Sequence, residues 1–176
     1  MIGPNTPFSQ YPSEQLMRRL EATPFPRNVA ALLHAGANAH PDRPLLHLID
    51  DEIILSYSAL HRDVARLADS LSRLGVRRGS HVGIMVNTTQ TYPITWLALA
   101  TLGAVTVPIN YAYTSRELNY VLTDAACRFL IIDHDFTPLY LSIVDPPISN
   151  ERVIVAGPAQ PSWRTWETLL AEGDPG

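Results

Sequence analysis

The sequence contains no lysine, because all 13 of its basic residues are arginines. This absence excludes three chemistries that need a primary amine. They are a phosphate-binding loop ending in Gly-Lys-Ser/Thr, a Schiff-base nucleophile, and a lysine that neutralises a transferring phosphoryl group. An enzyme that used any of them would need residues outside this chain.

Cysteine is almost absent as well, since Cys127 stands alone. An internal disulfide and a zinc site of several thiolates are therefore excluded, and we expect Cys127 to be a small buried side chain. No apolar run approaches the roughly 18 residues of a membrane span, and the first residues lack the order of a secretory signal. We therefore expect a cytoplasmic protein. The formal charge of -4 gives no basic excess for nucleic acid.

The residues that are present predict one folded unit, because 46% of the 176 residues are hydrophobic. Five prolines in residues 1–27 predict an irregular N-terminal arm with a short helix around Glu14–Glu21. Asn28 has the position and chemistry of an N-cap for a helix over Val29–Ala39. The globular part is therefore expected to begin at residue 28.

Hydrophobic periodicity then predicts alternating strands and helices. Leu45–Ile49 and Ile53–Leu55 form a β-hairpin around a polar corner at residues 50–52. An amphipathic helix follows over residues 56–74, then a strand over His81–Val86 and a second helix over Gln90–Leu102. Glycines stand where a left-handed backbone is expected, at Gly75, Gly79 and Gly103.

Three further apolar runs complete the expected sheet. They are Val105–Val107, Phe129–Ile132 and Val153–Val155, and a helix with a capping box at Thr114–Glu117 lies between the first two. Strands and helices that alternate in units of about 25 residues are typical of right-handed βαβ crossovers. The fold class is therefore α/β, a mostly parallel sheet with flanking helices plus a small β-hairpin.

The tail is expected to be separate from the α/β unit of residues 28–160. Residues 161–176 are interpreted as a short helix over Ser162–Ala171, bearing Trp163 and Trp166, and a truncated linker.

Two turns are candidate ligand sites. Residues Asn87–Gln90 open a helix, and the free N–H groups of a helix N-terminus could bind an anion. The turn lacks the glycines that would let a pyrophosphate approach the backbone, so the alternative is simple helix capping by Thr88 or Thr89. Asp133-His134-Asp135 has metal-ligating composition, but the alternative is a solvated turn at a strand end. His61, Arg62 and Asp63 are expected on the solvated face of their helix.

Motifs in a fixed order give the chain a family resemblance. Leu55–Leu60, Leu74–Gly79, His81–Met85, Gly103–Asn110 and Phe129–Asp133 resemble the adenylate-forming superfamily of acyl-CoA synthetases, luciferases and peptide-synthetase adenylation domains. Further matches follow the same order: Glu117, Leu118, Tyr120, Leu122 and Asp124. The resemblance implies the N-terminal subdomain of the acyl-CoA synthetase fold.

The same resemblance implies a two-step reaction for the parent enzyme. A carboxylate attacks the α-phosphate of ATP to give an acyl-adenylate and pyrophosphate, and the thiol of coenzyme A then takes the acyl group. ATP, Mg and CoA are the implied cofactors of the parent, held by a phosphate loop, a magnesium carboxylate and a lysine that come later in family members. This chain is therefore expected to hold no cofactor, to lack catalytic residues and to be inactive alone. Its expected partner is the remainder of the same enzyme, with a homodimer as a further possibility.

The resemblance also points to one candidate substrate-binding loop. In related enzymes the stretch after the Pro-x-Asn element lies near the pantetheine tunnel, which implies Asn110, Tyr111 and Tyr113 here. Ala112 stands where some members carry an arginine. The alternative is a turn in which Asn110 caps itself and the tyrosines pack. For the whole chain, the alternative function is a stand-alone, non-catalytic α/β binding or interaction module.

Overall fold

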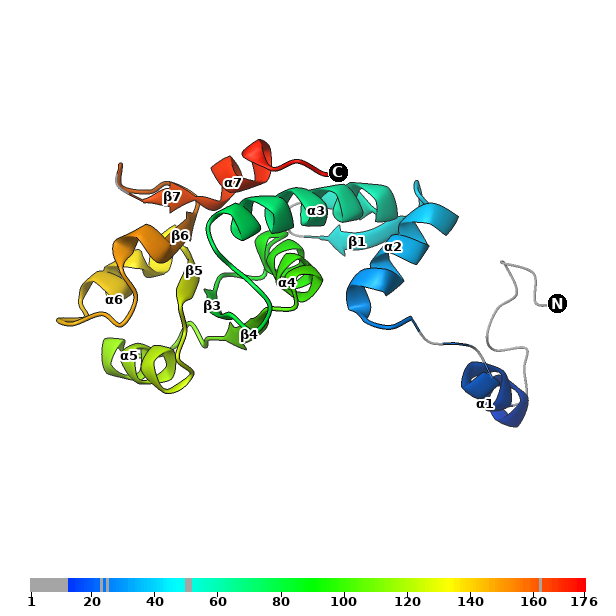
Figure 1. The fold of residues 1–176 in the computed structure, drawn as a ribbon, viewed down its shortest axis with the longest axis horizontal. Coiled ribbons are helices and arrows are strands. Elements are labelled where there is room, and N and C mark those ends of the chain that lie inside the picture. The colour runs from blue at the N-terminus through cyan, green and yellow to red at the C-terminus, as the bar shows by residue number, and fades with distance from the viewer. Residues whose placement is uncertain (1–12, 23, 25, 50–51, 162) are drawn as a thin grey trace.

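The computed structural model describes residues 13–22, 24, 26–49, 52–161 and 163–176. Most of the predicted N-terminal arm and part of the hairpin corner thus lie outside the described residues. The short helix predicted in the arm is confirmed as α1 (Ser13–Ala22), which stands clear of the other elements in Figure 1. Within the described residues, no helix combines the length and apolar character needed to cross a bilayer.

Helix α2 (Val29–Ala39) begins where its cap predicts. The Asn28 Oδ1 accepts a hydrogen bond from the Ala31 N–H at 2.8 Å, which satisfies one of the free donors of the first turn. The next two elements, β1 (Pro44–Leu48) and β2 (Ile53–Ser56), pair antiparallel. The predicted β-hairpin is therefore confirmed.

Helix α3 (Tyr57–Arg73) is the long amphipathic helix of the fold. Ser56 caps it, because its Oγ accepts a hydrogen bond from the Ala59 N–H at 3.2 Å. The apolar residues predicted to share one face are buried together: Leu60, Val64, Leu67, Ala68 and Leu71. The left-handed glycines are also confirmed, with φ of 101° at Gly75, 77° at Gly79 and 66° at Gly103.

Five parallel strands form the central sheet, as the α/β prediction requires. They are β3 (His81–Met85), β4 (Val105–Pro108), β5 (Phe129–Asp133), β6 (Val153–Ala156) and β7 (Arg164–Thr165), in the spatial order β4-β3-β5-β6-β7. β3 lies between β4 and β5, so the chain moves to one side of β3 first and then crosses to the other.

Helices cover both faces of this sheet (Figure 1). The remaining helical elements are α4 (Thr91–Leu102), α5 (Ser115–Asp124), η2 (His134–Phe136), α6 (Thr137–Leu141), η3 (Asn150–Arg152) and α7 (Trp166–Glu172). Ile84 and Ile131 join one core with α3, α4 and α7, whereas Leu130 and Ile132 join a second core with α5 and α6. Alternate residues of each strand therefore fill opposite cores.

The tail corrects one prediction. The helix expected over 162–171 begins only at Trp166, and a strand, β7, precedes it and pairs with β6. Trp163 therefore lies outside the helix, where it is buried with its ring edge-on to Tyr140 at 6.5 Å between centroids. A two-residue strand is too short to show a period, which is why the sequence pattern did not indicate it.

Candidate functional site

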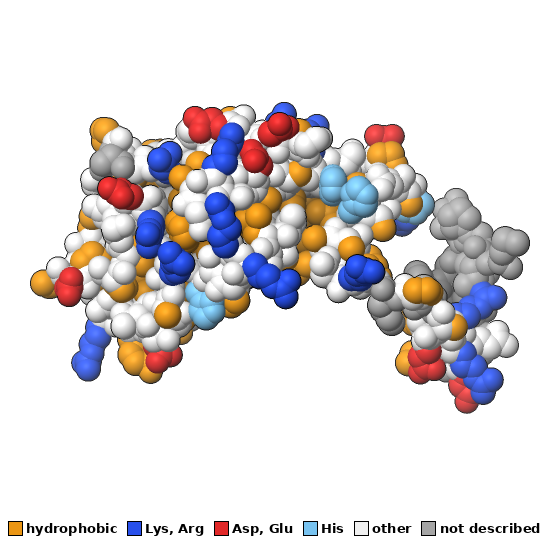
Figure 2. Space-filling view, in the orientation of Figure 1, with side chains coloured by type: hydrophobic (Ala, Val, Ile, Leu, Met, Phe, Trp, Pro, Cys, Tyr) orange, Lys and Arg blue, Asp and Glu red, His pale blue; other side chains and the backbone are white. Residues whose placement is uncertain are grey.

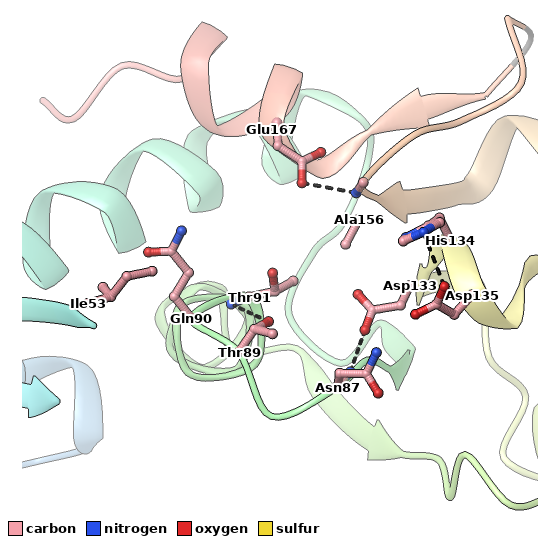
Figure 3. Close-up of a pocket in the computed structure, with 11 residues that line it drawn as sticks. Ile53, Asn87, Thr89, Gln90, Thr91, Asp133, His134, Asp135, Ala156 and Glu167 are labelled. Atoms are coloured by element: carbon pink, nitrogen blue, oxygen red, sulfur yellow. Dashed lines mark hydrogen bonds and ion pairs between the residues drawn. The ribbon is translucent and has the colours of Figure 1, made fainter. Parts of the chain in front are cut away.

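The carboxyl ends of β3 and β5 meet at the point where the chain reverses its direction through the sheet. Ligand sites of open α/β sheets lie at such switch points, outside the carboxyl ends of the strands. A pocket of about 280 Å³ occupies this position (Figure 3). Its polar lining residues come from the segments after β3, β5 and β6 and from the first turn of α7: Asn87, Thr89, Gln90, Thr91, Asp133, His134, Asp135, Gly157 and Glu167.

A buried carboxylate joins the two central strands of this pocket. Asp133 is only 7% exposed, and its Oδ2 accepts a hydrogen bond from the backbone N–H of Asn87 at 2.5 Å. Burial raises the pKa of Asp133 above its ordinary value, and the hydrogen bond from Asn87 opposes that rise. Of the three residues expected in a solvated turn, Asp133 is buried instead, whereas His134 and Asp135 are exposed as expected.

A second carboxylate occupies the other side of the pocket in the same way. Glu167, in the first turn of α7, accepts a hydrogen bond from the backbone N–H of Gly157 through Oε1 at 3.0 Å. Two backbone donors at the sheet edge are thus already bonded to side-chain carboxylates, as Figure 3 shows. Neither of these two donors is therefore free to bind a phosphate, and both carboxylates would repel one.

The turn Asn87–Gln90 caps α4 only weakly. Thr89 Oγ1 accepts from the Thr91 N–H at 3.4 Å, and the Gln90 side chain makes no cap hydrogen bond. Thr89 thus makes a weak local hydrogen bond but not the expected N-cap, because the N-cap residue of α4 is Gln90.

The Asp133-His134-Asp135 triplet does not converge on one point. His134 Nε2 lies 3.1 Å from Asp135 Oδ1 in an exposed ion pair, while Asp133 is bonded to Asn87. In the part of the chain that the structure describes, no group of three or more His, Cys, Asp or Glu is placed to hold a metal ion.

The predicted loop after β4 lies at the same edge of the sheet. Asn110 Oδ1 accepts a hydrogen bond from the Ala112 N–H at 2.9 Å, which is the self-capped turn given as the alternative. Tyr111 is 66% exposed and stacks on Phe136, with ring centroids 6.2 Å apart and planes 13° apart. Tyr113 is partly buried. Ligand binding by Asn110, Tyr111 and Tyr113 stays a prediction.

Glu167 was missed by sequence reasoning, and so was the bond between Asp133 and Asn87. A signal existed for that bond. Asp133 ends β5 and Asn87 stands two residues after β3, a βαβ topology makes these strands parallel, and the carboxyl ends of parallel strands share one edge. Glu167 gave no such signal, because β7 and the start of α7 were not foreseen.

Comparison with known proteins agrees with this architecture. A family model described as AMP-binding enzyme matches residues 33–173. The medium-chain acyl-CoA ligase ACSF2, mitochondrial, of Rattus norvegicus is 31% identical over 119 residues, which cover 67% of this chain and 19% of the relative. The chain therefore belongs to the AMP-binding enzyme family, and it spans about a fifth of that relative's length.

Two solved structures show the same fold. The anthranilate CoA ligase AuaEII, in complex with anthranoyl-AMP, superposes with a TM-score of 0.79 at 22% identity, covering 89% of this chain and 30% of that one. The N-terminal domain of FACL13 from Mycobacterium tuberculosis superposes with a TM-score of 0.74 at 21% identity. The match covers 85% of this chain and 36% of that one. The fold is that of the N-terminal region of acyl-CoA ligases.

Proposed function

We propose that this chain is the N-terminal α/β part of an ATP-dependent acyl-CoA ligase, which joins a carboxylate to ATP as acyl-AMP and then to CoA as a thioester. The family match over residues 33–173 carries this proposal. The printed names of the relatives, among them medium-chain acyl-CoA ligase and crotonobetaine/carnitine--CoA ligase, support an acid-thiol ligase as the parent. The proposed location is the cytoplasm, although ACSF2 is named as mitochondrial.

The chain alone is proposed to be inactive and to bind no cofactor. Two observations support this. The sequence has no lysine to neutralise a transferring phosphoryl group, and carboxylates already occupy the backbone donors of Asn87 and Gly157 at the sheet edge. In this proposal ATP and Mg bind to the rest of the parent enzyme, and so does CoA apart from a contact with the loop at residues 110–113.

Asn110, Tyr111 and Tyr113 are proposed to form one wall of the substrate cleft in the parent. Their position beside the switch point and the exposure of Tyr111 support this role. In an active ligase that contains this chain, Tyr111→Ala should raise the KM for CoA at nearly constant kcat, because contacts made equally in ground and transition states change only KM. An unchanged KM would remove Tyr111 from the cleft.

Exposed apolar residues support a large missing partner. Ile54 is 57% exposed and Trp96 is 42% exposed, on β2 and α4 respectively, and Leu141 and Val144 are exposed near α6. We propose that the remainder of the enzyme covers these side chains and that the isolated chain forms homodimers through them. Light scattering tests this, and a monomer at every concentration would instead favour the stand-alone module.

Pyrophosphate exchange tests the catalytic proposal directly. The purified chain, incubated with ATP, Mg²⁺, labelled pyrophosphate and a medium-chain acid, should produce no labelled ATP above a protein-free control. A heat-treated sample controls for contaminating ligase. Exchange that co-purifies with the folded chain would overturn the proposal that the chain is inactive alone.

A further inference from the structure

Two histidines meet between α2 and α3, where pale-blue side chains lie together on the surface in Figure 2. His34 lies on α2 and His61 on α3, and both line a pocket of about 280 Å³. The other lining side chains are apolar or neutral: Ala30, Ala31, Leu33, Val64, Ala65 and Thr101. The expectation that His61 is simply solvated is incomplete, since it is partly buried against His34.

The ring nitrogens of this pair lie within hydrogen-bond distance. His34 Nδ1 lies 3.2 Å from His61 Nε2, with ring centroids 5.2 Å apart and planes inclined by 53°. In the neutral state one of these nitrogens must carry a proton and the other must accept it. A cation that replaces this proton would remain bonded to both nitrogens.

We propose that His34 and His61 bind a divalent transition-metal ion, with Zn²⁺ as the representative case, and thereby connect α2 to α3. Zinc lies about 2.0–2.1 Å from imidazole nitrogens in tetrahedral sites, which places two such nitrogens about 3.3 Å apart. The observed separation of 3.2 Å is close to this value. Water fills the remaining coordination positions, because the pocket is open to solvent.

Apart from the two imidazoles, the side chains that line the pocket are uncharged. None of the residues that line the pocket carries a carboxylate or a guanidinium group. Imidazole donors without carboxylates select Zn²⁺, Cu²⁺ or Ni²⁺ over Mg²⁺ and Ca²⁺.

Asn38 supplies the outer partner that metal-bound histidines usually have. Its side-chain amide lies 2.9 Å from His34 Nε2, the ring nitrogen that faces away from His61. When Nδ1 of His34 binds the metal, Nε2 of the same ring carries the proton. The Asn38 side-chain amide turns so that its oxygen and nitrogen exchange places, and its Oδ1 then accepts a hydrogen bond from this Nε2–H. The amide thus orients the His34 ring toward the metal.

Titration calorimetry with ZnCl₂ on the chelator-treated 176-residue chain tests the site. We expect one ion per chain and a melting temperature that rises with Zn²⁺ and returns when EDTA is added. His34→Ala and His61→Ala should each weaken binding at least tenfold, whereas His47→Ala, an exposed histidine on β1, should bind as the parent does. Melting in EDTA checks that every variant folds.

The Asn38 variants separate this site from adventitious binding. Removing an outer partner costs about tenfold or more in metal affinity, so Asn38→Leu should bind more weakly and Asn38→Asp more tightly than the parent. Unchanged affinity in both histidine variants, no saturable binding, or an equal response to Mg²⁺ would overturn the proposal. It is independent of the proposed ligase function, because no step uses ATP or CoA.

Discussion

The two ends of the chain pack against the same helix in different ways. Along α3, helix α7 buries Trp166 and Leu169, and Gly173 lies directly against the α3 backbone. Helix α2 reaches α3 from the other end of the sequence and buries one residue, Leu33, next to the half-exposed histidine pair. The flank of α3 that faces α7 is tightly packed, whereas the flank that faces α2 is partly exposed. We therefore expect the α2 flank to open more easily than the α7 flank.

The largest effect should come from Gly173→Ala. A Cβ at this position would lie 2.0 Å from the Arg66 carbonyl oxygen, and a backbone atom within α3 cannot move aside. We expect the free energy of unfolding to fall by about 3 kcal/mol in urea titrations. Glu172→Ala is the control, because this neighbouring side chain is exposed and its hydrogen bond to Arg73 uses the backbone carbonyl, which the substitution keeps. Equal stability of the two variants would show that α7 does not dock tightly.

The next effect concerns the buried hydrogen bond of α7. Trp166 Nε1 donates to Thr95 Oγ1 at 2.9 Å, and both side chains are buried. Trp166→Phe should cost about 2 kcal/mol in the free energy of unfolding, because it removes ring atoms and leaves the Thr95 hydroxyl without this partner. A double-mutant cycle with Thr95→Val isolates the bond, and strictly additive losses would mean that it contributes nothing.

Hydrogen exchange should separate the two flanks without mutation. Amides of α2 should exchange at least about tenfold faster than those of α7, because opening α2 exposes less apolar surface. Ser70 Oγ additionally donates to the Leu169 carbonyl at 2.7 Å, and Arg73 Nη2 donates to the Glu172 carbonyl at 2.8 Å, which fastens α7 to α3. Equal protection would abolish the contrast between the flanks.

The smallest effect is a pH dependence at the α2 flank. The pKa of His61 is lower in the folded chain than its ordinary value of 6.5. At a pH between these two pKa values the unfolded chain binds more protons than the folded chain. The contribution of His61 to the free energy of unfolding is therefore complete above pH 6.5 and is lost as the pH falls through the folded pKa. Chemical unfolding in EDTA between pH 8 and pH 5 measures it, and His61→Gln should flatten the slope. A slope that persists in this variant assigns the effect to other groups.

Local chemistry explains what the sequence predicted well. Asn28 fixed the start of α2, and the capping box at Thr114 and Glu117 fixed that of α5, where the Glu117 carboxylate accepts from the Thr114 N–H at 2.8 Å. Each of these signals acts within four residues, so no tertiary information was needed.

The candidate pocket was harder to predict because its contacts join distant segments. Asp133 meets Asn87 across 46 positions, and its burial depends on the strand order, which the sequence constrains only through the rules for βαβ units. Glu167 reaches Gly157 only because a two-residue strand redirects the chain before α7. The sequence therefore predicted the sheet and its direction but not the side chains that close its edge.

The carboxylates of Asp133 and Glu167 have a consequence for protein engineering. Each accepts a hydrogen bond from a backbone N–H that closely follows a strand, at Asn87 after β3 and at Gly157 after β6, so the sheet itself positions these donors. Exchanging both residues for small neutral ones would free these donors and remove the repulsive charge. The scaffold then becomes a rational starting point for a designed oxyanion receptor.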